Sequence, residues 1–113
     1  MDDIEKHLHF LRQRIRAFAE AKAQRIYLEH FRKSKKAMLI NKAEIKGIKT
    51  AQERDSYART QPEYLEVLDG LRVAIENEAK LGLEIETCKL KIEVWRTKES
   101  SKRAEMMGYG NRG

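Results

Sequence analysis

The sequence has very little of what interrupts a helix. Its 113 residues include one proline and six glycines, and neither residue type occurs before Gly47. From residue 48 to residue 107, only Pro62, Gly70 and Gly82 could interrupt a helix. Charged residues make up 37% of the chain, which together with the lack of turn residues is typical of long helices. We therefore expect an all-α, coiled-coil-like fold rather than a compact globule.

Cysteine and long apolar runs are also scarce. Cys88 is the only cysteine, so no intrachain disulfide can form, and a reducing cytoplasm is the expected location. No apolar run approaches the length of about 18 residues that a membrane-spanning helix needs. The acidic start at Asp2, Asp3 and Glu5 is unlike a signal peptide.

Motifs for catalysis and for metal binding are missing. There is no glycine-rich phosphate loop and no Cys–His or Ser–His–Asp set with supporting context. His7 and His9 are two positions apart, which places them on different faces of a helix. Cys88 occupies an apolar seam, where a packed thiol is expected rather than a nucleophile. We expect no enzyme activity, no cofactor and no metal site.

Apolar residues in the first part of the chain recur at helical spacing. Positions three and four apart form one seam and, beyond Lys22, a second, shifted seam that carries lysines. Asp2 or Asp3 can cap the start of this helix, and Gly47 can end it. The pattern predicts one helix over about 3–46. The seams are Ile4, Leu8, Leu11, Ile15 and Phe18, then Leu28, Phe31, Lys35, Met38, Lys42 and Ile45.

Two helix-start signals follow within the connector, residues 47–61. Thr50 with Glu53, and Thr60 with Glu63, each match a capping box, and Pro62 suits the first turn of a helix. We expect a short helix, a corner, and a second long helix over about 62–106. The prediction is one helical domain over 1–107, folded as a hairpin, with a flexible tail at 108–113.

The last helix carries two apolar stripes. One could pack on the first helix, and the second, flanking line is Leu83, Leu90 and Val94. Because a thin hairpin buries little surface, we expect a homo-oligomer joined mainly through residues 64–96, with its stoichiometry undetermined. The residues predicted for oligomerisation are Leu68, Leu71, Ile75, Ile85, Cys88, Ile92 and Trp95.

Positive charge is concentrated in the first half. Residues 1–54 hold 14 Lys or Arg against 7 Asp or Glu, or +7, whereas residues 55–113 hold 10 against 11, or −1. A linear basic stripe favours phosphate, and neighbouring aromatic rings could stack on bases of a single strand. No base-reading motif is present, so binding would be sequence-neutral, to DNA or RNA. The candidate contacts are Arg12, Arg16, Lys22, Arg25, Tyr27, Phe31, Arg32, Lys33, Lys35, Lys36, Lys42 and Lys46.

Other interpretations of the basic stripe stay open. It could be only a solvated helix surface, with Tyr27 and Phe31 in the core. It could dock on an acidic protein, as in a helical inhibitor or adaptor. The chain could also be a structural coiled-coil component, or lie on a membrane surface, although the apolar face then competes with folding.

Three segments carry a family resemblance: "YLEHFRKSKKAMLINKAEIKG", "KTAQERDSYARTQPEYLEVLDGL" and "KLKIEVWRTKESSKRAEM". Together they resemble the aromatic-then-basic helix, the connector and the oligomerising helix of the UvsY-type phage recombination mediators. The resemblance implies a helical oligomer that binds single-stranded DNA and assists a recombinase or annealing protein. It implies DNA contacts for Arg32, Lys33, Lys35, Lys36 and Lys42, and subunit contacts for Leu68, Ile75, Ile85, Ile92 and Trp95.

Overall fold

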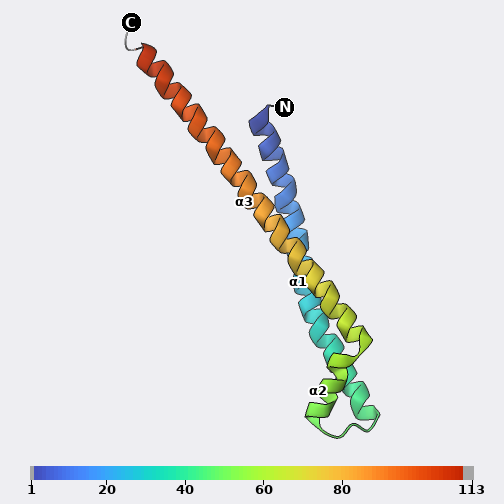
Figure 1. Ribbon diagram of the computed structural model, residues 1–113. Coiled ribbons are helices and arrows are strands. Elements are labelled where there is room, and N and C mark those ends of the chain that lie inside the picture. The colour runs from blue at the N-terminus through green and yellow to red at the C-terminus, as the bar shows by residue number, and fades with distance from the viewer. Residues whose placement is uncertain (1, 111–113) are drawn as a thin grey trace. The chain divides into compact units, whose positions relative to one another are not determined.

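The computed structural model describes residues 2–110, which form three helices: α1 (Asp3–Ile45), α2 (Ala51–Thr60) and α3 (Pro62–Gly110) (Figure 1). No strand occurs in this part of the chain, and the predicted all-α hairpin of two long helices with a short connecting helix is confirmed. Oligomerisation stays a prediction. Over the same residues, none of the helices combines the length and the apolar character that a membrane span requires.

Helix α1 is capped as its sequence predicts. The backbone N–H of Glu5 donates to Asp2 Oδ1 at 2.9 Å, which satisfies one of the free donors of the first turn. At the other end Gly47 has a φ of 90°. The N–H of Gly47 bonds the carbonyl of Glu44 at 3.0 Å, and the N–H of Ile48 bonds that of Ala43 at 3.1 Å. Glycine ends the helix because this left-handed conformation is strained for other residues.

The two predicted capping boxes have different outcomes. Thr50 caps α2, since its Oγ1 accepts a hydrogen bond from the Glu53 N–H at 3.1 Å. Thr60 instead is the last residue of α2, and its hydroxyl donates to the carbonyls of Ser56 and Tyr57. The prediction that Thr60 caps α3 was therefore wrong. Gln61 stands at the corner, where its carbonyl accepts the first backbone hydrogen bonds of α3.

Helix α3 begins at Pro62, at the first helical position where the missing N–H costs nothing, as predicted. It runs to Gly110, four residues beyond the predicted end at about 106. Residues 108–110 of the predicted tail are thus helical, and residues 111–113 lie outside the described residues. Gly70 and Gly82 lie inside α3 and do not interrupt it.

The chain divides into two compact units, each containing parts of α1 and α3. We call residues 19–79 the loop unit, and the described residues 2–18 with 80–110 the terminal unit. In each unit the two long helices run antiparallel. Residues later in α1 contact residues earlier in α3. Lys35 pairs with Glu63 and Arg25 with Glu78 in the loop unit. The single-domain prediction over 1–107 is not tested by this division.

The core of the loop unit lies where its three helices meet (Figure 1). Leu39, Ala58 and Tyr64 form a buried cluster, one residue from each helix, with Ile40 packed beside it. The predicted seam of α1 was one position off here. Leu39 is 3% exposed, whereas the predicted seam residue Met38 is 62% exposed and Ile45 is 84% exposed. Phe31 is likewise exposed.

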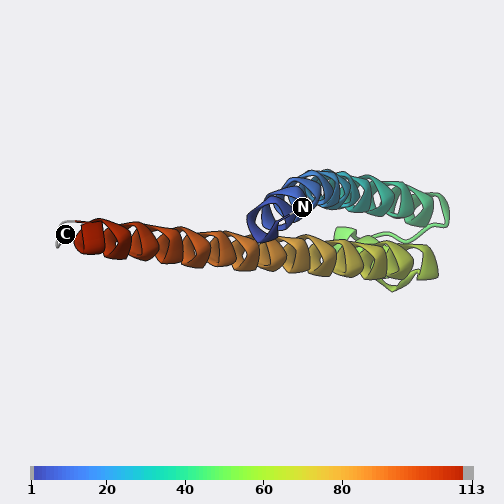
Figure 2. The same ribbon diagram turned by 90° about the horizontal axis from the view of Figure 1, so that it is seen from above.

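The terminal unit packs the start of α1 on α3 (Figure 2). Leu81, Ile85 and Cys88 are buried, and the Cys88 thiol donates to the carbonyl of His7 at 3.2 Å. A side chain at Gly82 would stand 3.5 Å from the ring of Phe18, so the glycine leaves room for that ring. Leu8 and Ile15 of the predicted seam are exposed, and the half-buried positions are Ile4, His7, Leu11, Arg14, Ala17 and Phe18.

The seam shift gives a first prediction. Leu39→Ala should lower the free energy of unfolding by about 2–5 kcal/mol, because it opens a cavity in the buried cluster. Met38→Ala is the matched control, since the same kind of truncation at an exposed neighbour should change stability by about 0.5 kcal/mol or less. Urea unfolding followed by circular dichroism measures both. Equal losses for the two variants would contradict the assigned seam.

Candidate nucleic-acid interface

The basic segment of α1 meets an acidic segment of α3 inside the loop unit. Residues 19–45 hold seven Lys or Arg against three Glu, or +4, and residues 62–79 hold one Arg against five Asp or Glu, or −4. The two segments run side by side in the hairpin (Figure 1). Much of the charge asymmetry seen along the sequence is therefore balanced within the folded chain.

Arg25 contributes to this charge compensation through three hydrogen bonds to carboxylates. Its guanidinium donates to both carboxylate oxygens of Glu78 on α3, and to Glu29 Oε1 of its own helix at 3.0 Å. These hydrogen bonds, first that to Glu78 and then that to Glu29, raise the pKa of Arg25 above its ordinary value. Arg25 and Glu78 are both largely covered, with side chains 24% and 16% exposed. Less of this guanidinium is therefore open to an anion than the sequence suggested.

Three other candidate cations also face the rest of the loop unit. Arg32 Nη1 lies 3.4 Å from the hydroxyl of Tyr64, and Lys35 Nζ lies 3.6 Å from Glu63 Oε2. Lys36 Nζ lies 2.6 Å from Asp55 Oδ1, and the hydrogen bond from Lys36 is the main cause that lowers the pKa of Asp55. Arg25, Lys35 and Lys36 each lie against a carboxylate of their own chain, so part of their charge is compensated, and their contact with phosphate stays a prediction.

The other predicted cations of the loop unit are exposed. Lys22, Lys33 and Lys42 have no ion-pair partner among the described residues. Lys46 Nζ lies 5.2 Å from the centre of the Tyr57 ring, in a cation–π contact that leaves its charge uncompensated. These four lysines are the part of the predicted stripe that remains open to an anion.

The open cations do not lie on one face. At about 100° per residue, Lys42 stands about 20° from Phe31 around the helix. Lys46 follows the last residue of α1. Lys22 and Lys33 stand about 160–180° from Phe31, on the far side. One strand cannot follow all of them along a straight helix. The face that combines aromatic rings with open cations is therefore narrower than predicted.

Tyr27 and Phe31 form a ring pair on that narrower face. Their centroids are 6.0 Å apart with an interplanar angle of 14°, and the two side chains are 60% and 39% exposed. The alternative that both rings belong to the core is excluded by this exposure. Two stacked rings open to solvent can accept a further flat group on their faces. We call Tyr27, Phe31, Lys42 and Lys46 the aromatic face.

In the terminal unit the remaining candidates, Arg12 and Arg16, are exposed on α1. Arg14, which was not predicted, lies between them and turns to α3. Its Nε is 3.1 Å from Glu84 Oε2, and its guanidinium stands 4.7 Å from the centre of the Phe10 ring. Both of these ion-pair atoms are buried without a hydrogen-bond partner among the described residues, so the contact is an ion pair alone.

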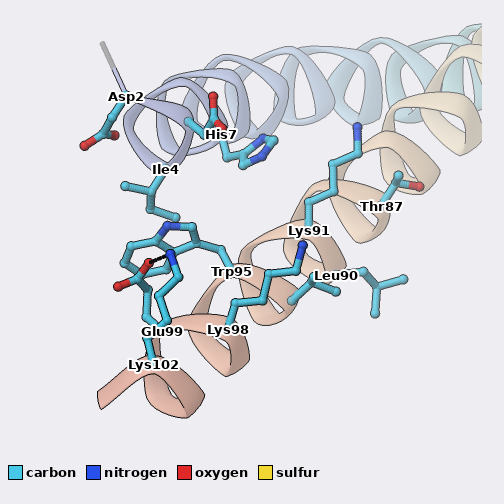
Figure 3. Close-up of a pocket in the computed structure, with 12 residues that line it drawn as sticks. Asp2, Ile4, His7, Thr87, Leu90, Lys91, Trp95, Lys98, Glu99 and Lys102 are labelled. Carbon is cyan, nitrogen blue, oxygen red and sulfur yellow. Dashed lines mark hydrogen bonds and ion pairs between the residues drawn. The ribbon is translucent and has the colours of Figure 1, made fainter. Parts of the chain in front are cut away.

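The terminal unit also has open grooves between α1 and α3. One, of about 750 Å³, is shown in Figure 3, where Ile4 lies over Trp95 and Leu90 projects from the other side of α3. A second, of about 970 Å³, shares His7, Thr87 and Lys91 with the first. Within the described part of the chain, no group of three His, Cys, Asp or Glu side chains could hold a metal ion.

The predicted oligomerisation residues separate into two sets. Leu71, Ile85 and Cys88 are buried inside their own unit, and Ile92 is half-buried. Burial within one chain leaves these four side chains little surface for a second copy, and their assignment to a subunit interface stays a prediction. Leu68, Ile75 and Trp95 are exposed. The flanking line Leu83, Leu90 and Val94 is exposed as well, so both exposed sets are candidates for a contact between subunits.

Sequence reasoning missed the acceptors on α3. The buried positions Leu71, Ala74, Leu81 and Ile85 are spaced three, seven and four apart, and Glu78 occupies the heptad position between Ala74 and Leu81. A glutamate at that position was the available signal that a cation lies opposite. Comparison with known proteins adds no assignment, since no protein family, no curated protein and no solved structure matches the chain.

The Arg25–Glu78 contact gives a second prediction. Arg25→Glu and Glu78→Arg should each lower the thermal unfolding midpoint, because each leaves two like charges together in the seam. The double variant should recover much of the loss, since it restores an opposite pair in reverse order. Thermal unfolding followed by circular dichroism measures the cycle. Additive losses in the double variant would show that the pair does not couple α1 to α3.

Asp55 gives a third prediction, in pH dependence. Because its pKa is lowered in the folded chain, its contribution to stability is complete above the ordinary value of 3.8 and is lost as pH falls through the lower folded value. Asp55→Asn should therefore be less stable than the parent near neutral pH, and the difference should shrink in acid. Asp69→Asn is the control, because Asp69 is exposed and pairs only along its own helix with Arg72. A difference that is constant with pH would contradict the assignment.

Proposed function

We propose that the chain binds single-stranded nucleic acid, without base specificity, through the aromatic face of α1. The observation that carries the proposal is the exposed stack of Tyr27 and Phe31, with Lys42 about 17 Å further along α1 on the same side of the helix and Lys46 just past its end. Large apolar rings on a surface need a reason, and base stacking is one that tolerates any sequence. The two lysines supply positive charge for the neighbouring phosphates.

The geometry supports a short binding segment. From Tyr27 to Lys46 the helix rises about 29 Å. Two open lysines correspond to about two phosphate contacts, so the logarithm of affinity should fall with the logarithm of salt with a slope of about −1.4 per chain. Such a site is weak alone. Several chains on one strand would strengthen it through avidity.

The setting of this activity is proposed from the resemblance to the UvsY-type mediators. In that setting the chain is a phage accessory protein that assists a recombinase or annealing protein on single-stranded DNA. The aromatic face lies within the segment that resembles the family's DNA-contacting helix. Of the contacts that the resemblance implies, Lys42 fits the aromatic face, whereas Lys35 and Lys36 pair with carboxylates of the chain.

An acidic protein partner is the second candidate function. Phe31, Met38 and Ile45 are all exposed and recur every seven residues, which is the spacing of a row that contacts another helix. Lys42 beside this row would favour a helix with acidic flanks. In this alternative Met38 and Ile45 contribute as much as Phe31, whereas base stacking depends on the aromatic rings.

The fourth prediction separates these functions. Fluorescence anisotropy with a labelled oligothymidine at low salt should show weakening of about 5- to 150-fold for Phe31→Ala, because base stacking is worth about 1–3 kcal/mol. Met38→Ala should bind like the parent. Lys42→Gln should weaken binding more than Lys33→Gln, although both remove one positive charge, because Lys33 lies on the far side of the helix.

The opposite results would end the proposal. If Phe31→Ala binds as the parent does, the rings do not stack on bases. If Lys33→Gln and Lys42→Gln weaken binding equally, the effect is general charge and the aromatic face is not the site. If no oligonucleotide binds at low salt, the acidic protein partner becomes the better candidate. Circular dichroism of each variant confirms that the helices are intact.

A further inference from the structure

Helix α3 carries an uncharged line that its own chain does not cover. In the terminal unit the helix faces α1 with Leu81, Ile85 and Cys88. A second line is shifted by two residues, or about 200° around the helix. Its members Leu83, Thr87, Leu90 and Val94 border the grooves beside α1 and are not covered by it. We call this line the outer stripe: Leu83, Thr87, Leu90, Val94, Thr97, Ser101, Ala104 and Gly108.

The outer stripe is continuous and exposed. Its members alternate four and three residues apart, which is the a/d spacing of a coiled coil, and none of them is charged although the surrounding helix is rich in Lys and Glu. Leu83, Leu90 and Val94 are 69%, 66% and 55% exposed, and the other five are also exposed. Figure 3 shows Leu90 on the side of α3 away from Ile4 and Trp95.

No other described segment of the chain covers the end of α3. All side chains from 100 to 108 are exposed, yet the segment is helical. Short helices are marginal in water and draw most of their stability from packing an amphipathic face. The outer stripe is the face that this segment has available for packing.

The residue types along the outer stripe favour one kind of partner, a second helix in parallel orientation. Thr87 and Val94 stand at the a positions and Leu83 and Leu90 at the d positions. β-Branched residues at a with leucine at d favour a parallel pair of helices. A second copy of this same helix presents the same stripe and can supply that pair.

The charged residues beside the outer stripe also favour a parallel pair of helices. The g positions are Glu86 and Glu93, and the e positions that follow them by five residues are Lys91 and Lys98. In a parallel pair in register, each g side chain meets the e side chain of the next heptad on the other helix, so Glu86 faces Lys91 and Glu93 faces Lys98. An antiparallel pair would set Glu against Glu.

These four side chains are available for contacts between copies. Lys91 and Lys98 have no ion-pair partner among the described residues. Glu86 pairs only with Lys89 at 3.6 Å, and Glu93 only with Arg96 at 3.2 Å, each three residues along the same helix. Such exposed pairs are weak and do not compete strongly with a second partner.

We infer that the chain forms a parallel, in-register homodimer in which the outer stripes of two α3 helices pack together, flanked by Glu86–Lys91 and Glu93–Lys98 contacts between the copies. The stripe rises about 38 Å from Leu83 to Gly108. Leu83, Thr87, Leu90 and Val94 form its apolar part, and the smaller residues that follow allow the helices to stay close. The dimer does not depend on the proposed nucleic-acid binding, and either can fail without the other.

Charge reversal on the full chain tests the dimer, and this is the fifth prediction. Lys91→Glu with Lys98→Glu, and separately Glu86→Lys with Glu93→Lys, should each weaken dimerisation by about tenfold or more, because four attractive contacts become repulsive. An equimolar mixture of the two variants should recover dimers, since opposite charges then meet again. Sedimentation at micromolar concentration measures all three samples.

Cross-linking tests the orientation. Ser101→Cys places a thiol on the outer stripe, where two copies in parallel register meet, so it should oxidise readily to a covalent dimer. Arg103→Cys is the matched control on the opposite face of the helix and should cross-link slowly. Cys88 is buried and remains a background common to both variants.

The inference is overturned by any of three results. A parent that sediments as a folded monomer at micromolar concentration excludes the dimer. Charge-reversed variants that both dimerise as strongly as the parent place the interface elsewhere. Equal cross-linking of Ser101→Cys and Arg103→Cys would exclude the parallel register. Circular dichroism on each variant shows whether the hairpin itself is intact.

Discussion

The fold depends on cations of α1 that occupy seam positions and are met by acceptors on α3. Arg14 meets Glu84, Arg25 meets Glu78, and Lys35 meets Glu63. A purely apolar seam would tolerate many alignments of two long helices. A cation left without its acceptor in a partly buried seam is costly, so these contacts favour one alignment over its neighbours. The aromatic face and the outer stripe are the surfaces that this alignment leaves open.

The ion pairs between α1 and α3 separate the basic residues into two groups, those in the seam and those on the surface. Cations that point into the seam hold the helices together, and their charge is compensated by carboxylates of the chain. Those that point outward, such as Lys42, remain available to an anionic partner. The net charge of the first half therefore overstates the charge that a nucleic acid could meet. Affinity would come from stacking and from several chains acting together, more than from one strongly basic surface.

The two helices also differ in how they use their second faces. On α1, the face beside the seam carries aromatic rings and open lysines. On α3, a face that α1 does not cover carries the uncharged outer stripe between glutamates and lysines. A chain with one face for ligand and another for a second copy can place two ligand surfaces in one particle.

The sequence by itself determined the helices and their ends, because these depend on local chemistry: Asp2 and Thr50 as caps, Gly47 with positive φ, and Pro62 in a first turn. It did not determine which face of α1 is buried. Several apolar lines on that helix differ by one position, and only contact with α3 selects Leu39 over Met38. Nor did the sequence show that Arg25 lies in the seam while Lys42 lies on the surface. That difference depends on whether α3 places a carboxylate opposite the cation, as Glu78 does for Arg25.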